Sequence, residues 1–144
     1  MVSEVRILSP PQNNLYNSMK TIKQKYSIKA PVEKVWQSLV DPKIIKQWGG
    51  GPAKMDDKVG TNFKLWGGDI YGKNLKVIKN KLLIQNWISG DWPRPSQVTF
   101  KLSVVKGKTQ LDLLHTGVPD EDYADIADGW KEYYLGPLKD NLEK

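Results

Sequence analysis

The chain has one histidine, His115, and this side chain is the first candidate for acid–base chemistry. With a single histidine and no cysteine, the sequence excludes disulfides, thiolate metal sites, thiol catalysis and zinc sites that need two histidines. Asp112 lies three positions before His115, but side chains three apart on a strand point to opposite faces of the sheet. The two groups therefore cannot meet directly, and a lone histidine at a strand end is more often structural. An enzyme that uses His115 or a carboxylate in a cavity is the least favoured of three functional hypotheses.

Aromatic side chains are unusually abundant, with six tryptophans, six tyrosines and two phenylalanines among 144 residues. Large rigid rings are hard to pack solidly between one sheet and one helix, and gaps between them would form a pocket lined by aromatic rings that holds an apolar small molecule. The other interpretation, which the abundance of rings alone favours, is that most of them are ordinary core residues. Trp92, beside Pro93 in a loop, is the tryptophan most expected to be exposed and to contact a ligand. The residues predicted to bind the ligand are Trp66, Trp87, Phe100, Trp130 and Tyr134.

Two other motifs carry little signal for a site. Gly67 and the Gly72-Lys73 pair are spaced as in a phosphate-binding loop, but Asn74 replaces the hydroxyl residue and a strand pattern follows instead of a helix. The carboxylates between Asp120 and Asp128 spread around a helix axis, where they complement the helix dipole. The sequence therefore predicts no catalytic set, no metal site and no cofactor, and a protein that is not an enzyme.

The net charge of +6 is distributed unevenly along the chain. Residues 119–144 hold eight acidic residues against three lysines, a net of −5, which leaves +11 on residues 1–118. Only Arg6 and Arg94 could form the bidentate contacts that favour phosphate and guanine recognition, so a nucleic-acid partner is not predicted. Most lysines are expected to solvate the outer face of a sheet; alternatively, they form a basic surface that docks on an acidic protein.

Hydrophobic periodicity defines the elements that must position these side chains. Alternation from residue 21 to 29 predicts a first strand with one lysine-lined face, and helical spacing predicts two short helices over 31–40 and 42–48. Short turns then separate six further strands, so neighbouring strands are expected to be antiparallel. These strands are predicted at residues 53–57, 61–66, 70–78, 82–89, 97–105 and 109–116. In the last hairpin, one apolar face is expected to carry Val98, Phe100, Leu102, Val104, Leu111 and Leu113.

The last element is an amphipathic helix of about six turns from Pro119-Asp120 to Leu142. Its apolar side is predicted to carry Tyr123, Ile126, Ala127, Trp130, Tyr133 or Tyr134, Leu138 and Leu142. Gly136-Pro137 is expected to kink this helix without ending it. The fold class is therefore α+β, in which a seven-stranded antiparallel sheet packs its apolar face against the C-terminal helix.

Residues 1–19 show no periodicity and contain turn-forming residues, so they are predicted to form a flexible N-terminal arm before a single domain at 20–144. The longest apolar stretch, Leu82 to Ile84, is far shorter than the roughly 20 residues that span a bilayer, so no membrane association is predicted. The N-terminus has no basic segment followed by an apolar one, as a secretory signal would. We therefore expect a cytoplasmic protein.

The sequence resembles the C-terminal domain of the activators of heat-shock protein 90 ATPase, within the START-like (SRPBCC, Bet v-type) superfamily. The most specific stretch is Gly129-Trp130-Lys131-Glu132-Tyr133-Tyr134, which follows the Thr116-Gly117-Val118-Pro119 turn. The resemblance covers about Met19 to Leu142, and within that range the stretch from Tyr26 to Trp36 carries it as well. It implies the helix-grip fold, in which the sheet wraps around the long C-terminal helix with two short helices between the first two strands and a deep cavity between sheet and helix.

The resemblance implies two different functions. The leading hypothesis is a non-enzymatic module that binds a small hydrophobic or aromatic ligand in that cavity. The alternative is a cochaperone-like interaction domain, with a role in stress response, that docks on a chaperone of the heat-shock protein 90 type. In the eukaryotic activators an additional N-terminal domain binds the chaperone, whereas about twenty residues precede the first predicted strand here. This difference ranks the small-ligand hypothesis first.

Overall fold

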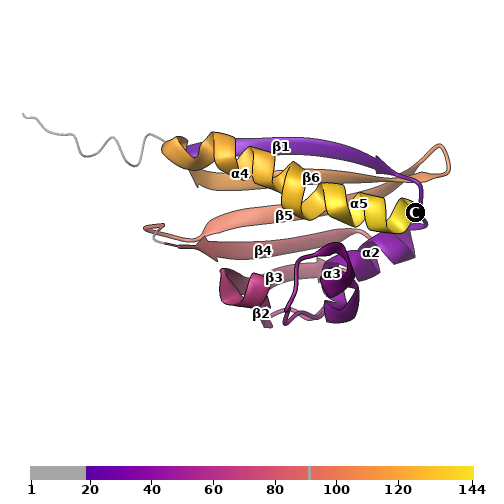
Figure 1. The fold of residues 1–144 in the computed structure, drawn as a ribbon, viewed down its shortest axis with the longest axis horizontal. Coiled ribbons are helices and arrows are strands. Elements are labelled where there is room, and N and C mark those ends of the chain that lie inside the picture. The colour runs from indigo at the N-terminus through magenta and orange to yellow at the C-terminus, as the bar shows by residue number, and fades with distance from the viewer. Residues whose placement is uncertain (1–18, 91) are drawn as a thin grey trace, which may run out of the picture.

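The computed structural model describes residues 19–90 and 92–144, which form one antiparallel sheet with helices on one face (Figure 1). The strands are β1 (Met19–Ile28), β2 (Asn62–Leu65), β3 (Ile70–Ile78), β4 (Leu82–Ser89), β5 (Ser96–Val105) and β6 (Lys108–Pro119). Their order across the sheet is β1-β6-β5-β4-β3-β2, and every neighbouring pair is antiparallel. The fold is α+β, as predicted.

Within residues 19–90 and 92–144 the sheet has six strands, so the prediction of seven was wrong. The segment predicted at residues 53–57 forms only one isolated bridge, between Lys54 and Lys64. After that bridge, the carbonyls of Asp56 and Lys58 do not pair with a neighbouring strand. They accept hydrogen bonds from the side chain of Asn74, whose Nδ2 donates to them at 3.0 and 3.1 Å. The segment is therefore a loop attached to the edge of the sheet.

Two short helices, α2 (Val32–Val40) and α3 (Pro42–Trp48), follow β1 as predicted. The break between them has a local cause, since the Asp41 side chain accepts a hydrogen bond from the Lys43 N–H at 2.9 Å and caps α3. Pro42 occupies the first turn of α3, where its missing N–H has no helical partner to lose. Gly49 ends α3 in the left-handed region, with φ of 106°.

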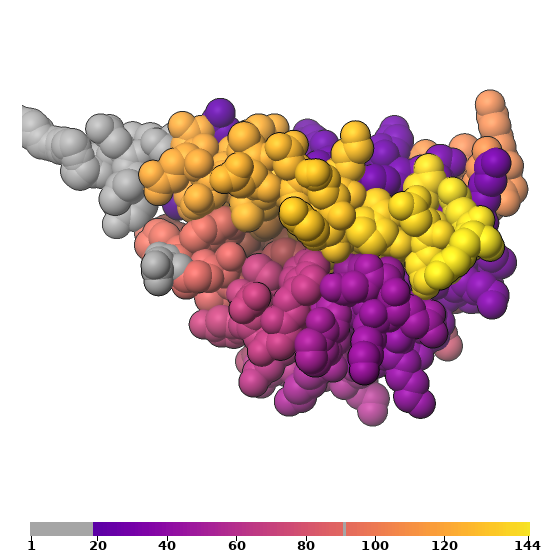
Figure 2. Space-filling view, viewed as in Figure 1, coloured from indigo at the N-terminus to yellow at the C-terminus, as the bar shows by residue number. Residues whose placement is uncertain are grey.

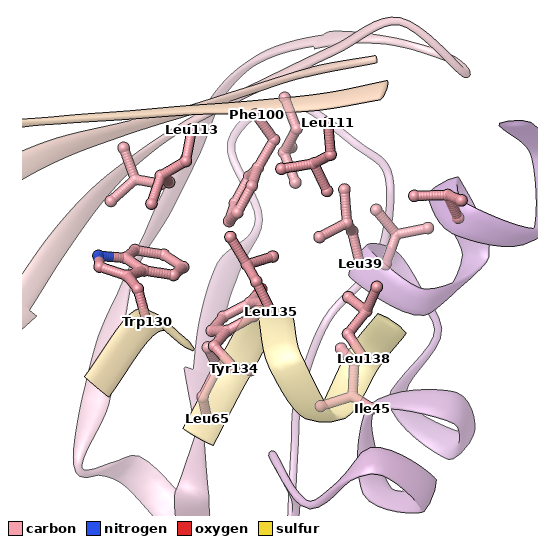
Figure 3. Close-up of a cluster of buried hydrophobic side chains, with 14 of the residues drawn as sticks. Leu39, Ile45, Leu65, Phe100, Leu111, Leu113, Trp130, Tyr134, Leu135 and Leu138 are labelled. Atoms are coloured by element: carbon pink, nitrogen blue, oxygen red, sulfur yellow. The ribbon is translucent and has the colours of Figure 1, made fainter. Parts of the chain in front are cut away.

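The inner face of the sheet carries the core, as the alternation predicted. Phe100 pairs with Leu113, and Leu102 with Leu111, so these side chains share one face. Val104 was predicted on this face as well, but it lies at the end of β5 and is 65% exposed. Figure 3 shows the inner side chains meeting those of the C-terminal helix and of α2 and α3 in one buried cluster.

The C-terminal helix crosses the inner face of the sheet without interruption (Figure 1). It comprises a 3₁₀ turn, η2 (Asp120–Asp122), then α4 (Tyr123–Gly129), a π-helical turn, η3 (Trp130–Leu135), and α5 (Gly136–Glu143). The Gly136 N–H donates to the Lys131 carbonyl, five residues earlier, and Pro137 has no N–H to donate. Gly136-Pro137 therefore does not end the helix, as predicted, because a wider turn accommodates it.

Gly136→Ala should destabilise the protein by about 1–3 kcal/mol, although alanine usually stabilises a helix relative to glycine by about 1 kcal/mol. A Cβ at this position would collide with the Lys131 carbonyl oxygen, the acceptor of the π-helical bond. Gly129 is the matched control in the same helix, because a Cβ there first meets Tyr133 Cδ2 at 3.9 Å, an ordinary contact. Urea unfolding of both variants should show opposite signs; a stabilised Gly136→Ala variant would contradict this account.

The predicted arm at residues 1–19 lies outside the described residues except for Met19. Met19 pairs with Pro119 as the first residue of β1, so the sheet begins one residue before the predicted domain boundary. Within the described residues, no helix combines the length and the apolarity that crossing a bilayer requires.

Candidate functional site

A pocket of about 370 Å³ lies between the C-terminal helix and the β2–β4 side of the sheet. The helix supplies its wall from α4 and η3, and the opposite wall comes from β3, β4 and the 3₁₀ turn η1 (Trp66–Gly68). Figure 2 shows this side of the molecule, with the orange-to-yellow helix above the magenta β2–β3 region. The lining residues are Trp66, Ile70, Trp87, Asp125, Ile126, Gly129, Trp130, Tyr133 and Tyr134.

Four of the five residues predicted to bind a ligand line this pocket: Trp66, Trp87, Trp130 and Tyr134. Phe100 does not, because it is fully buried on β5 beneath the helix. Its ring centroid lies 5.7 Å from those of Trp130 and Tyr134, so it supports two of the lining rings from behind. The ligand-binding role of all five residues stays a prediction.

The rings of Trp87, Trp130 and Tyr134 form one continuous aromatic layer. Trp87 and Trp130 stack with centroids 4.7 Å apart and planes 28° apart, and Tyr134 lies 4.8 Å from Trp130. Offset stacking of this kind is favourable beyond the area it buries. The pocket therefore has a floor of large rings that hold one another in place.

Tyr134 also carries the one hydroxyl of this layer. Its side chain is 1% exposed, and the hydroxyl has no hydrogen-bond partner among the described residues. Burial raises the pKa of this hydroxyl, so it stays protonated. An unpartnered buried hydroxyl is unfavourable unless another group bonds to it.

His115 connects the sheet to the helix through a directed chain of hydrogen bonds. The Trp130 indole N–H can only donate, and it donates to His115 Nδ1 at 3.0 Å. The proton of neutral His115 is therefore on Nε2, which donates to Ser96 Oγ at 2.8 Å. The Ser96 hydroxyl then donates to the Trp87 carbonyl at 3.3 Å. Burial lowers the pKa of His115 to about 4, because a charged imidazole would lose its hydration here.

This arrangement does not present His115 as a base. Nε2 already carries the proton that it would have to accept from Ser96, and Nδ1 accepts from an indole where a catalytic base would have a carboxylate. Asp112 lies on the outer face, as predicted, where Gln110 Nε2 donates to it at 3.0 Å. His115 is therefore a buried link that orients Trp130 at the pocket.

A second buried chain orients Trp87 from the other side. The Trp87 indole N–H donates to Gln85 Oε1 at 3.0 Å, and Gln85 Nε2 donates to Asn74 Oδ1 at 2.9 Å. Asn74 then donates to the loop carbonyls of Asp56 and Lys58. Both rings of the stacked pair are thus fixed by hydrogen bonds as well as by packing.

Sequence reasoning missed five residues that line the pocket. The missed residues are Ile70, Asp125, Ile126, Gly129 and Tyr133. Helical spacing puts Ile126, Gly129 and Tyr133 on one stripe, a signal that could have found them, whereas nothing in the sequence distinguishes Ile70. Trp92, expected to be exposed, is partly buried with its ring 6.2 Å from His115, and it does not line the pocket.

Among residues 19–90 and 92–144, no three carboxylate or histidine side chains gather as metal ligands would.

Comparison with known proteins gives a consistent family. The family model described as "Activator of Hsp90 ATPase homolog 1-like protein" matches residues 29–143. The chain is 26% identical to the activator of 90 kDa heat shock protein ATPase homolog of Dictyostelium discoideum, over 83% of this chain and 32% of that protein. It is 25% identical to homolog 2 of that activator in Mus musculus, over 78% of this chain and 34% of that protein. The chain thus spans about a third of the length of these relatives.

Two solved structures match over nearly their whole length. A protein of Mesorhizobium loti superposes with a TM-score of 0.76 at 28% identity, covering 86% of this chain and 97% of that one. The solution structure of the Aha1 dimer from Colwellia psychrerythraea gives a TM-score of 0.75 at 27% identity, covering 86% of this chain and 96% of that one. The fold is of the SRPBCC type, the helix-grip arrangement that the sequence resemblance implied.

Proposed function

This chain belongs to the activator of Hsp90 ATPase homolog 1-like family, and on that premise we propose that it is a non-enzymatic module that binds a small hydrophobic or aromatic ligand between its sheet and its C-terminal helix. The observation that carries the proposal is the pocket of about 370 Å³ lined by the rings of Trp66, Trp87, Trp130, Tyr133 and Tyr134. Small-molecule sites are typically concave, mostly apolar and within the range of about 300–1,000 Å³.

Two features of the pocket support a binding role. The stacked pair Trp87 and Trp130 is held by hydrogen bonds from two sides, so the floor is organised before a ligand arrives. No side chain of the pocket is arranged as an acid–base pair, which favours binding over catalysis.

The test is a titration of the protein with fatty acids, flavonoids and other apolar molecules, followed by amide chemical shifts and tryptophan fluorescence. Ile126→Phe should weaken binding of any ligand found by about tenfold or more, because it adds bulk to a partly buried lining residue. Ala124→Phe is the matched control, since residue 124 is exposed on the same helix and does not line the pocket. Silence across the whole panel, or equal effects of the two variants, would contradict the proposal.

A second candidate function is docking on a chaperone of the heat-shock protein 90 type, which the family and the relatives' names favour. The outer face of the sheet also favours docking on an acidic surface. Lys25 on β1 and Lys101 on β5 lie in register on either side of Asp112 on β6, so basic side chains outnumber the acidic one at this point. Charge pairing with an acidic surface would weaken as salt rises.

This second function has its own experiment. The chaperone should be retained by the protein at low salt and released at high salt, with a change in its ATPase rate. A Lys25→Glu/Lys101→Glu double variant should lose retention. Lys139→Glu/Lys144→Glu makes the same change of charge in α5 and at the residue that follows it, and it should keep retention. No retention at low salt would exclude docking.

A further inference from the structure

The charge around the pocket, like its aromatic rings, indicates which ligands it can bind. Asp125 is the only charged residue that lines it, and it has no ion pair with any residue in the described part of the chain. Residues 119–130 include five acidic residues, Asp120, Glu121, Asp122, Asp125 and Asp128, and no lysine or arginine. Only Asp120 of these acidic residues forms an ion pair within the described residues, with Lys20 at 2.9 Å. A pocket that opens beside this helix in a protein of net charge +6 therefore lies at a locally negative surface.

The aromatic rings at the pocket provide a second attraction for cations, in addition to the negative charge. Tyr133 lines the pocket and is 67% exposed, so a ligand can reach its ring. Trp66 is only partly buried, and its indole N–H is used by the Gly49 carbonyl at 2.8 Å. The faces of tryptophan and tyrosine rings are electron-rich and attract cations within about 6 Å of the ring centre.

The kind of cation follows from the scarcity of hydrogen-bond acceptors. A primary ammonium has three N–H donors, and burying them without acceptors is unfavourable. The lining side chains that a ligand can reach offer two acceptor groups, the Asp125 carboxylate and the Tyr133 hydroxyl, because the Tyr134 hydroxyl is buried. The rest of the lining consists mainly of rings and of the aliphatic Ile70 and Ile126. A quaternary ammonium has no N–H donor, so it loses less on entering such a pocket. Anionic ligands such as fatty acids would be repelled by the unpaired carboxylate of Asp125.

We propose that the ligand of this pocket is an organic cation, with an apolar body against the stacked tryptophans and a quaternary ammonium between Tyr133, Trp66 and Asp125. This inference rests on the proposed small-ligand function and names its ligand class. It predicts that charge, at constant shape, decides which ligands bind.

Three probes of one shape test the role of charge: 3-hydroxyphenyltrimethylammonium, its neutral carbon isostere 3-tert-butylphenol, and the anion 3-hydroxybenzenesulfonate. Titrations at pH 6.5, followed by the indole N–H signals of the tryptophans, should show the cation binding about tenfold more tightly than the isostere. The anion should bind most weakly. An isostere that binds as tightly as the cation would overturn the inference and leave the small-ligand function standing.

Matched charge variants localise the effect. Asp125→Asn should weaken binding of the cation by about two- to fivefold and leave the neutral isostere unchanged. Asp128→Asn removes the same charge from an exposed position of the same helix that does not line the pocket, so its effect should be smaller. Tyr133→Leu should weaken the cation's binding about fivefold while the isostere keeps its affinity. Equal effects of the two aspartate variants would overturn the assignment, and failure of the three probes and of the whole apolar panel would overturn the binding function as well.

Discussion

Trp130→Ala is expected to lower the free energy of unfolding by about 3–5 kcal/mol, as large aromatic truncations in cores do. Trp130 is 3% exposed, stacks on Trp87 and contacts the rings of Phe100 and Tyr134. Its removal also leaves His115 Nδ1 without its donor in a buried site. Urea unfolding followed by circular dichroism measures the loss directly.

Two further variants separate the contributions of Trp130. Trp130→Phe keeps a ring but removes the indole N–H, so it should be about 1–3 kcal/mol less stable than the original protein, mainly because the His115 acceptor becomes unpaired. Trp66→Ala truncates a tryptophan of the same pocket that is only partly buried, and it should destabilise the protein less than Trp130→Ala. If the two alanine variants are equally stable, Trp130 is not the central contact between helix and sheet.

Acidification should destabilise the protein through His115. The pKa of this group is about 4 when buried and about 6.5 in an unfolded chain, so between pH 6.5 and 4 the unfolded state takes up the proton and the folded state mostly does not. The free energy of unfolding is therefore unaffected by His115 above pH 6.5, falls as the pH drops towards 4, and is flat below it. The expected loss is about 3 kcal/mol in total, of which about 2 kcal/mol appears between pH 7 and 5.

The measurement is urea unfolding at several pH values between 5 and 7, together with an NMR titration of the imidazole itself. His115→Gln should remove the slope between pH 5 and 7, because its amide does not titrate. A folded protein in which His115 titrates near 6.5 would contradict the burial and the hydrogen-bond chain described for it. In the neutral ring the proton is on Nε2, and Nδ1 accepts from the Trp130 indole N–H. A charged ring would carry a proton on Nδ1 as well, so two N–H groups would face each other and this hydrogen bond would be lost.

The candidate site shows how far residue types alone can lead. The excess of tryptophan and tyrosine pointed to a pocket, and Trp66, Trp87, Trp130 and Tyr134 do line one. Phe100 does not line it, because the alternation on β5 indicates only that its side chain faces the core, and not whether the helix covers it. Trp92 does not line the pocket, because its ring lies near His115, a contact between residues distant in the sequence.

The sequence alone determined the elements of this protein, because hydrophobic periodicity, turn residues and helix breaks such as Asp41-Pro42 act over a few neighbouring positions. It also determined which face of each strand and helix is apolar. Only the tertiary structure decided that the segment near Met55 is a loop, that His115 meets Ser96 and Trp130, and that Asp125 is the one charge in an aromatic pocket. These contacts join residues far apart in the chain, so they depend on how the C-terminal helix crosses the sheet, and no local pattern encodes that placement.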